Sequence, residues 1–267
     1  MATSSDYISV LHLTDPHIRA KPEDTLLGVN TAYYFNAVLE CAFASGQSYD
    51  LCLLTGDLAQ DPCKASYQYI LDRLQTHHTP CICLPGNHDV FSIMRAVFNL
   101  ANINCIKHKI LGKWQIIALN SQIPGANGGY LAAEELGFLT QTLNEYSDLY
   151  TLIAIHHHCL PTESRWMDTM IVQNAQALFD AVKPYPAVKI IIHGHIHQAI
   201  ETQLESVKVL ATPSTCFQFK PKSVEFDLDN LSPGYRSLKL YNDGIITSEV
   251  VRIPETLCGI EVNSEGY

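Results

Sequence analysis

A chain of 267 residues with 47% hydrophobic and 16% charged side chains can bury a sizeable core without disulfides, and its composition argues against disorder. The formal net charge of -10 and the lack of a basic stripe argue against a dedicated nucleic-acid binder. No run approaches about 18 consecutive apolar residues, so we expect no membrane-spanning helix and no membrane partner.

Strand-like and helix-like stretches alternate through the first two thirds of the chain. In chain order, we predict strand 8–13, helix 29–44, strand 50–54, helix 64–76, strand 81–84, helix 89–101, strand 114–120, helix 132–146, strand 151–155, helix 172–182 and strand 188–192. This alternation predicts a layered α/β fold.

The last third changes character, from about residue 199. Five strand-like runs follow one another, at 199–204, 207–211, 224–228, 235–241 and 245–251. Asn242-Asp243-Gly244 is a hairpin signal between the last two. We therefore expect a mostly β section that forms a second sheet packed on the first, within a single domain that spans residues 1–267.

Nine cysteines stand at irregular positions, several of them inside apolar runs such as residues 51–54. The first residues show neither the basic nor the apolar region of an export signal, so we expect reduced thiols in a cytoplasmic protein. Cys81 and Cys83 could belong to a zinc or redox site. Zinc needs a second pair of ligands, however, and redox pairs usually have a two-residue gap. Two small apolar side chains on a buried strand are the simpler interpretation.

Polar side chains follow five of the strand-like runs, where α/β folds place their ligands. These blocks are Asp15-Pro16-His17, Gly56-Asp57, Asn87-His88-Asp89, the triplet that begins at His156, and Gly194-His195-Ile196-His197. In the first and last blocks, a spacing of two residues puts both members of a pair on one side of an extended backbone. Each block alone is usually a turn. Together, their carboxylate, amide and imidazole groups predict a site for iron, manganese or zinc.

In this order, the five blocks resemble the motif set of the calcineurin-like metallophosphoesterase superfamily. Further strings resemble the bacterial class III 3',5'-cyclic-AMP phosphodiesterases, namely residues 27–31, 55–61, 194–198, 212–216, 218–221 and 232–236. The resemblance runs from about residue 8 to about residue 250. It implies an α/β fold of four layers, αββα, in which two packed sheets are flanked by helices.

The resemblance also implies two divalent metal ions. We expect iron, manganese or both, with zinc or cobalt as alternatives. One ion would be held by Asp15, His17, Asp57 and His197. The other would be held by Asp57, Asn87, His156 and His195, so that Asp57 bridges the two. His157 and His158 would lie nearby without being ligands. Cys159 departs from the proline that is common in relatives.

The expected chemistry follows from charge. Two divalent ions would bring four positive charges, of which two carboxylates and a bridging hydroxide neutralise three. The site would keep about one positive charge, which attracts a phosphodiester. The ions would activate a hydroxide as the nucleophile. We expect His88 to act as general acid or phosphate clamp. Asp89 would orient His88 or cap the following helix. The residues expected to contact substrate are His17, Asp57, Asn87, His88 and His197.

Of the remaining side chains, we expect His193 to pack or hydrogen-bond behind the ligands. The loop Arg165-Trp166-Met167-Asp168 either packs or covers the base or phosphate of the substrate. The resemblance implies hydrolysis of 3',5'-cyclic AMP, a small-molecule cyclic nucleotide, to 5'-AMP, which lowers the level of a second messenger. Two alternatives are a broader phosphodiesterase acting on 2',3'-cyclic nucleotides or other esters, and a non-catalytic scaffold on the same fold. The oligomeric state stays open.

Overall fold

Two six-stranded sheets form the centre of the computed structural model, which describes residues 6–261 and 266. The first sheet has the order β14 (Ile246–Arg252), β13 (Gly234–Tyr241), β1 (Tyr7–Leu13), β2 (Leu51–Thr55), β3 (Cys81–Leu84) and β4 (Ile103–Asn104). The second has the order β5 (His108–Leu111), β6 (Trp114–Ala118), β7 (Tyr150–Ala154), β8 (Val188–His193), β10 (Val207–Ala211) and β9 (Glu201–Leu204). A separate ribbon pairs β11 (Gln218–Phe219) with β12 (Leu228–Asp229).

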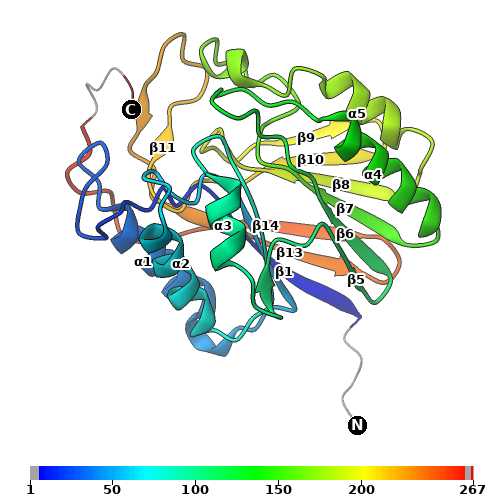
Figure 1. Cartoon of the computed structure of the whole chain (residues 1–267), viewed down its shortest axis with the longest axis horizontal. Coiled ribbons are helices and arrows are strands. Elements are labelled where there is room, and N and C mark those ends of the chain that lie inside the picture. Colours follow the sequence, from blue (N-terminus) through cyan, green and yellow to red (C-terminus); the bar gives the residue numbers. More distant parts are fainter. Residues whose placement is uncertain (1–5, 262–265, 267) are drawn as a thin grey trace.

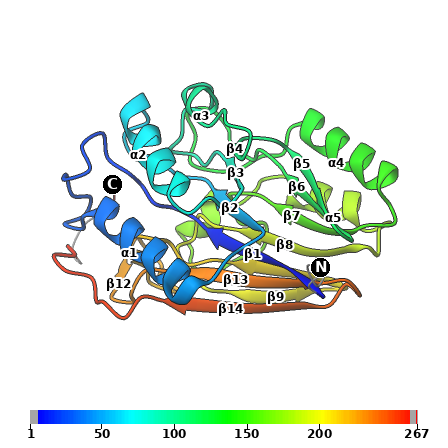
Figure 2. The ribbon, with the colours of Figure 1, turned by 90° about the horizontal axis from the view of Figure 1, so that it is seen from below.

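Helices cover the outer faces of both sheets, as Figures 1 and 2 show. Helices α1 (Thr31–Phe43), α2 (Lys64–Gln75) and α3 (Phe91–Val97) lie beside the first sheet, and α4 (Ala133–Glu145) and α5 (Ala175–Val182) lie beside the second. Short 3-10 turns, η1 (Ala44–Gly46) and η2 (Met167–Met170), complete the helical elements of the described residues. Within that part of the chain, no helix has the length and apolar character that crossing a membrane requires.

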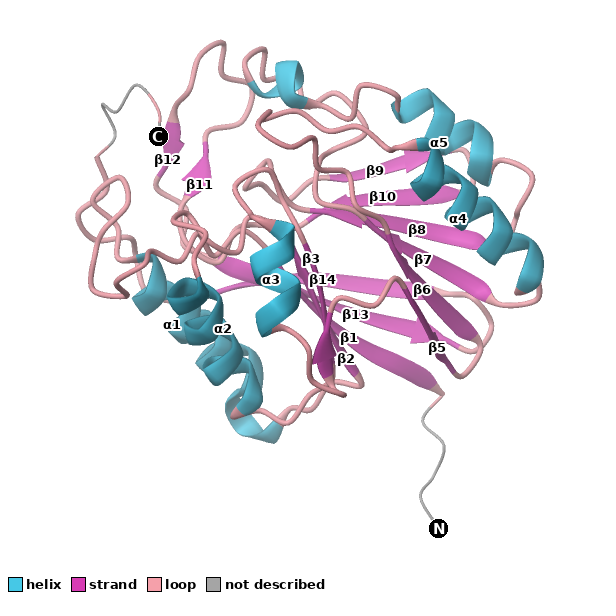
Figure 3. Cartoon of the chain, in the orientation of Figure 1, coloured by secondary structure: helices cyan, strands magenta, loops and turns pink. Residues whose placement is uncertain are grey.

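Side-chain alternation along the strands explains why four layers form. On β1, Val10 packs into the core between the two sheets, whereas its neighbour Leu11 packs toward the helices of the first sheet. Phe35 on α1 joins Leu11 in that outer core, and Leu139 on α4 belongs to a third core outside the second sheet. Successive strand residues point to opposite faces, so each sheet is buried on both sides. The predicted four-layer αββα fold is confirmed (Figure 3).

The inner strands run parallel, and this arrangement positions the polar blocks. Strands β1 to β4 are parallel to one another, as are β6, β7, β8 and β10. Parallel strands end at the same edge of their sheet, so the residues that follow them are brought together. The backbone continues this pairing beyond the strands, because the amide of Asp15 donates to the carbonyl of Gly56 at 3.1 Å.

The last third of the chain is arranged differently from the prediction. Strands β13 and β14 extend the first sheet and β9 and β10 extend the second, so among the described residues only the short pair β11–β12 forms a separate sheet in this section. The cause is long-range pairing: β13 lies antiparallel to β1, with Tyr241 opposite Tyr7. The hairpin predicted at Asn242-Asp243-Gly244 is present, and Gly244 has a positive φ of 85°.

Some predicted boundaries were also wrong. Residues 224–228 were expected to be a strand, but only Leu228 belongs to one, because Phe226 turns to pack on other aromatic rings. Strands β4, β5 and β11 were not predicted. β5 lies at a sheet edge, where its half-buried mixture of polar and apolar side chains gives no clear alternation.

Candidate metal centre

The chain segments that follow β1, β2, β3, β7 and β8 meet at one place and bring seven predicted ligands together. Six of these side chains are almost fully buried, and Asn87 is half-buried. The seven residues are Asp15, His17, Asp57, Asn87, His156, His195 and His197. Each of these residues lies in a segment that follows the carboxyl end of a strand, which is where α/β folds bind their ligands.

The backbone at this site adopts conformations that side chains other than glycine rarely take. Five of the seven residues have positive φ angles: 53° at Asp15, 46° at His17, 49° at Asp57, 68° at His195 and 48° at His197. Such conformations cost energy and persist only where the surroundings enforce them, and they cluster at functional sites. The left-handed turns let consecutive residues point into one small volume.

Glycines in the motifs make room for the convergence. At Gly86, a Cβ atom would lie 2.7 Å from Nε2 of His156 and even closer to Oδ1 of Asp57. At Gly194, a Cβ atom would collide with the side chains of Thr14 and Asp15. Contacts under about 3 Å do not occur for real side chains, so these positions have no space for any residue but glycine.

The imidazole rings of His17 and His197 point the lone pairs of their Nε2 atoms toward each other. The Nδ1 atom of His17 donates to Oε1 of Gln60 at 2.9 Å, and Nδ1 of His197 donates to the carbonyl of Phe217 at 2.9 Å. Both oxygens can only accept, so the protons lie on Nδ1 and the Nε2 atoms carry lone pairs. Those Nε2 atoms are 3.2 Å apart. Two facing lone pairs repel each other unless a proton or a metal ion lies between them. Burial disfavours the extra proton, because it lowers the pKa of His17, and two imidazole nitrogens are suitable ligands for a metal ion.

A second group of acceptors converges around His156. Its Nδ1 faces the carbonyl of Thr55 at 2.8 Å, while Nε2 faces Oδ1 of Asn87 at 3.1 Å and Oδ2 of Asp57 at 3.3 Å. Both ring nitrogens of His195 are buried without a hydrogen-bond partner among the described residues. The backbone amide of His195 donates to Asp15, which fixes the loop. Unpaired buried nitrogens are costly, so they indicate a missing partner.

Burial and neighbouring charges shift the pKa values of the site residues in different directions. Burial lowers the pKa of His17 to about 3 and that of His195 well below its ordinary value. Burial would likewise lower the pKa of His156, but the Asp57 carboxylate outweighs it and raises that pKa to about 9. Burial would raise the pKa of Asp57, yet His156 beside it holds the pKa well below the usual range. Neutral imidazoles and an ionised carboxylate are the forms that bind metal.

Comparison with known proteins identifies the family. Residues 8–199 match the calcineurin-like phosphoesterase model. The chain belongs to this family. The 3',5'-cyclic adenosine monophosphate phosphodiesterase CpdA of Escherichia coli K12 is 39% identical over 261 residues, covering 97% of this chain and 95% of that protein. A 3',5'-cyclic-nucleotide phosphodiesterase of Nostoc is 38% identical over 250 residues, covering 94% of each.

Solved structures support the fold of this calcineurin-like phosphoesterase. A dimetal phosphatase from Danio rerio aligns with a TM-score of 0.61 at 12% identity, over 92% of this chain and 99% of that one. GAP50, described as the anchor in the inner membrane complex of Plasmodium, aligns with a TM-score of 0.64 at 12% identity, over 97% and 90%. At this identity the likeness shows the fold alone, which hosts more than one function.

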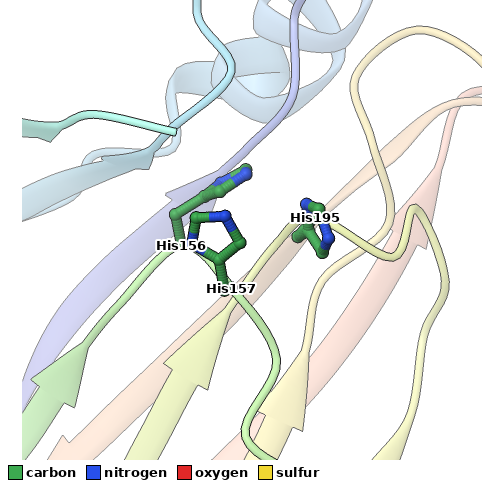
Figure 4. Close-up of side chains that lie close together, drawn as sticks. All are labelled: His156, His157 and His195. Atoms are coloured by element: carbon green, nitrogen blue, oxygen red, sulfur yellow. The ribbon is translucent and has the colours of Figure 1, made fainter. Parts of the chain in front are cut away.

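The geometry of the phosphoesterase adds His157 to the residues that could hold a metal. One nitrogen from each of His156, His157 and His195 lies within 4.8 Å of the others, and Figure 4 shows the three rings close together. The Nε2 atom of His157 is buried without a hydrogen-bond partner among the described residues, while Nδ1 is 2.8 Å from Oγ of Ser121. The sequence had placed His157 nearby as a non-ligand. The only hint in the sequence was that His157 lies next to His156. The direction in which the backbone turns there, which decides where the His157 ring points, could not be predicted from the sequence.

Asp89 does not cap the helix that follows it. Its carboxylate accepts hydrogen bonds from the amides of Gly86, Leu58 and Ala59 and from the hydroxyl of Tyr67. Helix α3 begins after Val90, whose side chain makes no capping bond. Burial, together with the Asp57 charge, raises the pKa of Asp89 to about 7. Asp89 therefore ties the loop after β2 to the loop after β3, and the expectation that it caps the following helix was wrong.

His88 lies at the mouth of the centre. Its backbone amide donates to Oδ1 of Asp57 at 2.9 Å, and its ring centroid is 5.0 Å from that of His17. A cavity of about 220 Å³ opens there, lined on one side by Asp57, Asn87, His88 and His195. His88 is half-buried and thus reachable from the cavity. His193 instead packs behind the ligands, with Nδ1 3.0 Å from the carbonyl of Gly194.

Proposed function

We propose that this calcineurin-like phosphoesterase hydrolyses 3',5'-cyclic AMP to 5'-AMP and so lowers the level of a second messenger. The proposal rests on one observation: acceptor atoms converge at the strand ends. The clearest case is the pair of Nε2 atoms of His17 and His197, which are 3.2 Å apart. The relatives named as cyclic-AMP phosphodiesterases support the substrate, because they align over nearly the whole chain.

In this proposal two divalent ions bind at the strand ends. One ion would be held by Asp15, His17, Asp57 and His197. The other would be held by Asp57, Asn87, His156 and His195. We expect the metals to be iron and manganese. When bound, the ions supply a water nucleophile at neutral pH and positive charge for the phosphodiester. Asp15, His17 and His197 already have one ligand atom each within 4.8 Å of the others.

The chain's own residues then orient the phosphate and protonate the leaving group. We expect the phosphate to contact His17, Asp57, Asn87 and His197, of which Asp57 and Asn87 line the cavity. His88 borders the cavity beside Asp57 and delivers a proton to the ribose 3'-oxygen, which is a poor leaving group without one. The hydrogen bond from the backbone amide of His88 to Asp57 fixes the backbone at this position, and the His88 side chain borders the cavity.

We place the activity in the cytoplasm, since all nine cysteines are free thiols. We also propose that residues 1–267 act as one domain. Pairing of β13 with β1 supports this, because the last third completes the sheet that the first residues begin.

A substrate panel tests the function. Metal-loaded protein is given 3',5'-cyclic AMP, 3',5'-cyclic GMP, 2',3'-cyclic AMP and a simple aryl phosphodiester, beside the Asp57→Ala variant. Conversion of 3',5'-cyclic AMP to 5'-AMP, lost in the variant, is the expected result. Turnover of only the other esters would leave the centre in place and remove the signalling role, and turnover of none would favour a scaffold.

A further inference from the structure

The wall of the cavity that faces away from the metal ligands is apolar and aromatic. Trp166, Met167, Met170, Phe219 and Phe226 line it, together with Asn127 and Gly266. Among the described residues, Asp57 is the only acidic side chain on the lining, and it lies on the opposite side with other candidate ligands. The cavity thus has one end for an anion and one end for a flat apolar group.

The aromatic rings of this wall hold one another in fixed orientations. The ring of Trp166 meets Phe219 at a centroid distance of 5.1 Å and Phe226 at 5.3 Å, with interplanar angles of 85° and 70°. Phe219 and Phe226 are 5.6 Å apart at 68°. Edge-to-face contacts of this kind are favourable and fix ring directions. Three rings therefore form one rigid surface instead of three independent side chains.

The wall is attached both to the metal centre and to a neighbouring loop. Phe219 stacks on the ring of His197, with centroids 4.1 Å apart and planes 21° from parallel. The indole Nε1 of Trp166 donates to Oγ of Ser223 at 2.9 Å, and the amide of Arg165 donates to the carbonyl of Ser223 at 3.0 Å. The polar edge of Trp166 is thereby occupied, so what this residue offers a ligand is its ring.

We propose that this aromatic wall, formed by Trp166, Phe219 and Phe226, stacks against the nucleobase of the substrate. The inference rests on the proposed function and deepens it: the site selects phosphodiesters that carry an aromatic base over esters that lack one. Aromatic stacking is tolerant of base identity, because every base has a flat face. The wall therefore selects nucleotides as a class, and choice among bases falls to other contacts.

Kinetics with and without the base test the wall. The substrates are 3',5'-cyclic AMP and its base-free analogue, the 3,5-cyclic phosphate of methyl riboside. In Trp166→Ala, we expect KM for cyclic AMP to rise about 10- to 100-fold while the base-free ester is unaffected. Trp166→Phe keeps a ring and should lose much less. Val224→Ala is the matched control, since Val224 lies in the loop between β11 and β12, next to Ser223, is 64% exposed and is not among the described residues that line the cavity.

Direct binding separates failure of the wall from failure of the proposed function. The chain has two tryptophans, and Trp114 is buried between the sheets. We expect 5'-AMP, but not ribose 5-phosphate, to quench tryptophan fluorescence, and Trp166→Phe to abolish the quenching. Equal quenching by both ligands, or equal losses on both substrates in Trp166→Ala, would overturn the wall even if cyclic AMP is turned over. If no cyclic nucleotide is turned over, the proposed function fails, and the quenching experiment still decides for or against the wall.

Discussion

The Nε2 atoms of His17 and His197 lie 3.2 Å apart, although 180 positions separate the two residues in the chain. Each ring has its Nδ1 proton committed to a carbonyl oxygen, of Gln60 and of Phe217 respectively. Both rings consequently aim lone pairs at the same point. A proton on one Nε2 would relieve that repulsion, but burial lowers the pKa of His17 to about 3 and so disfavours the protonated ring. A bound metal ion relieves the repulsion with both rings neutral.

Gln60 should therefore control metal affinity without being a ligand. Loss of such an orienting hydrogen bond typically costs about 10- to 100-fold in metal affinity. We expect Gln60→Ala to weaken Mn²⁺ binding by that factor, measured by calorimetry. Gln68→Ala is the control, because its amide bonds only to Asp72 on the surface of α2. Equal affinities in the two variants would show that the His17 tautomer does not depend on Gln60.

Substitution of two glycines should have opposite effects. Gly86→Ala places a Cβ atom against Asp57 and His156, so we expect loss of metal binding and of activity. Gly137 lies in α4 with nothing within 4 Å of the added carbon. Gly137→Ala should raise the free energy of unfolding by about 0.5–1 kcal/mol and leave metal content unchanged. Metal analysis and urea unfolding check both variants, and an active, metal-loaded Gly86→Ala protein would contradict the steric argument.

His88 should matter for the chemical step and not for metal content. General acid catalysis contributes about 10²- to 10⁴-fold, so we expect kcat of His88→Ala to fall within that range. His108→Ala serves as control, since His108 lies on the edge strand β5, where it bonds to Gln115. Steady-state kinetics and metal analysis are the measurements. A normal kcat in His88→Ala would assign proton delivery to another group.

Asp89 should stabilise the fold. Asp89→Ala leaves three backbone amides and the Tyr67 hydroxyl without their acceptor inside the protein. Each unpaired buried group costs about 1–3 kcal/mol, so we expect the free energy of unfolding to fall by at least about 3 kcal/mol. Asp72→Ala, at an exposed position of α2, should change it by less than about 0.5 kcal/mol. Urea unfolding measures both, and similar values for the two variants would refute the assignment.

The order of the inner elements could be predicted from the sequence because their patterns are local. Apolar runs such as 81–84 are closed by Pro85-Gly86, and the polar residues that follow them are visible as blocks. Pairing between strands that are far apart in the chain has no comparable local sequence pattern. Nothing within residues 234–241 indicates that they lie beside β1, so the last third was assigned to a separate sheet.

Within the candidate site, the sequence shows which side chains could be ligands, but it does not show the directions in which those side chains point. The chemistry of Asp15 or His195 follows from its side chain and its place after a strand. The roles of His157 and Asp89 depend on where the backbone turns, and left-handed φ angles at non-glycine residues cannot be predicted from these patterns. The aromatic wall likewise joins two segments, at Trp166 and at Phe219 and Phe226, that only the fold brings together.

The most direct test couples metal content to cyclic-AMP hydrolysis in one titration. Purified protein is stripped with a chelator, and Mn²⁺ is added back stepwise while bound metal and 5'-AMP formation are both measured. We predict no turnover by the stripped protein and restoration that saturates at two ions per chain, with neither binding nor turnover normal in Asp57→Asn. Full 3',5'-cyclic-AMP hydrolysis by metal-free protein, or none by protein carrying two ions, would contradict the account.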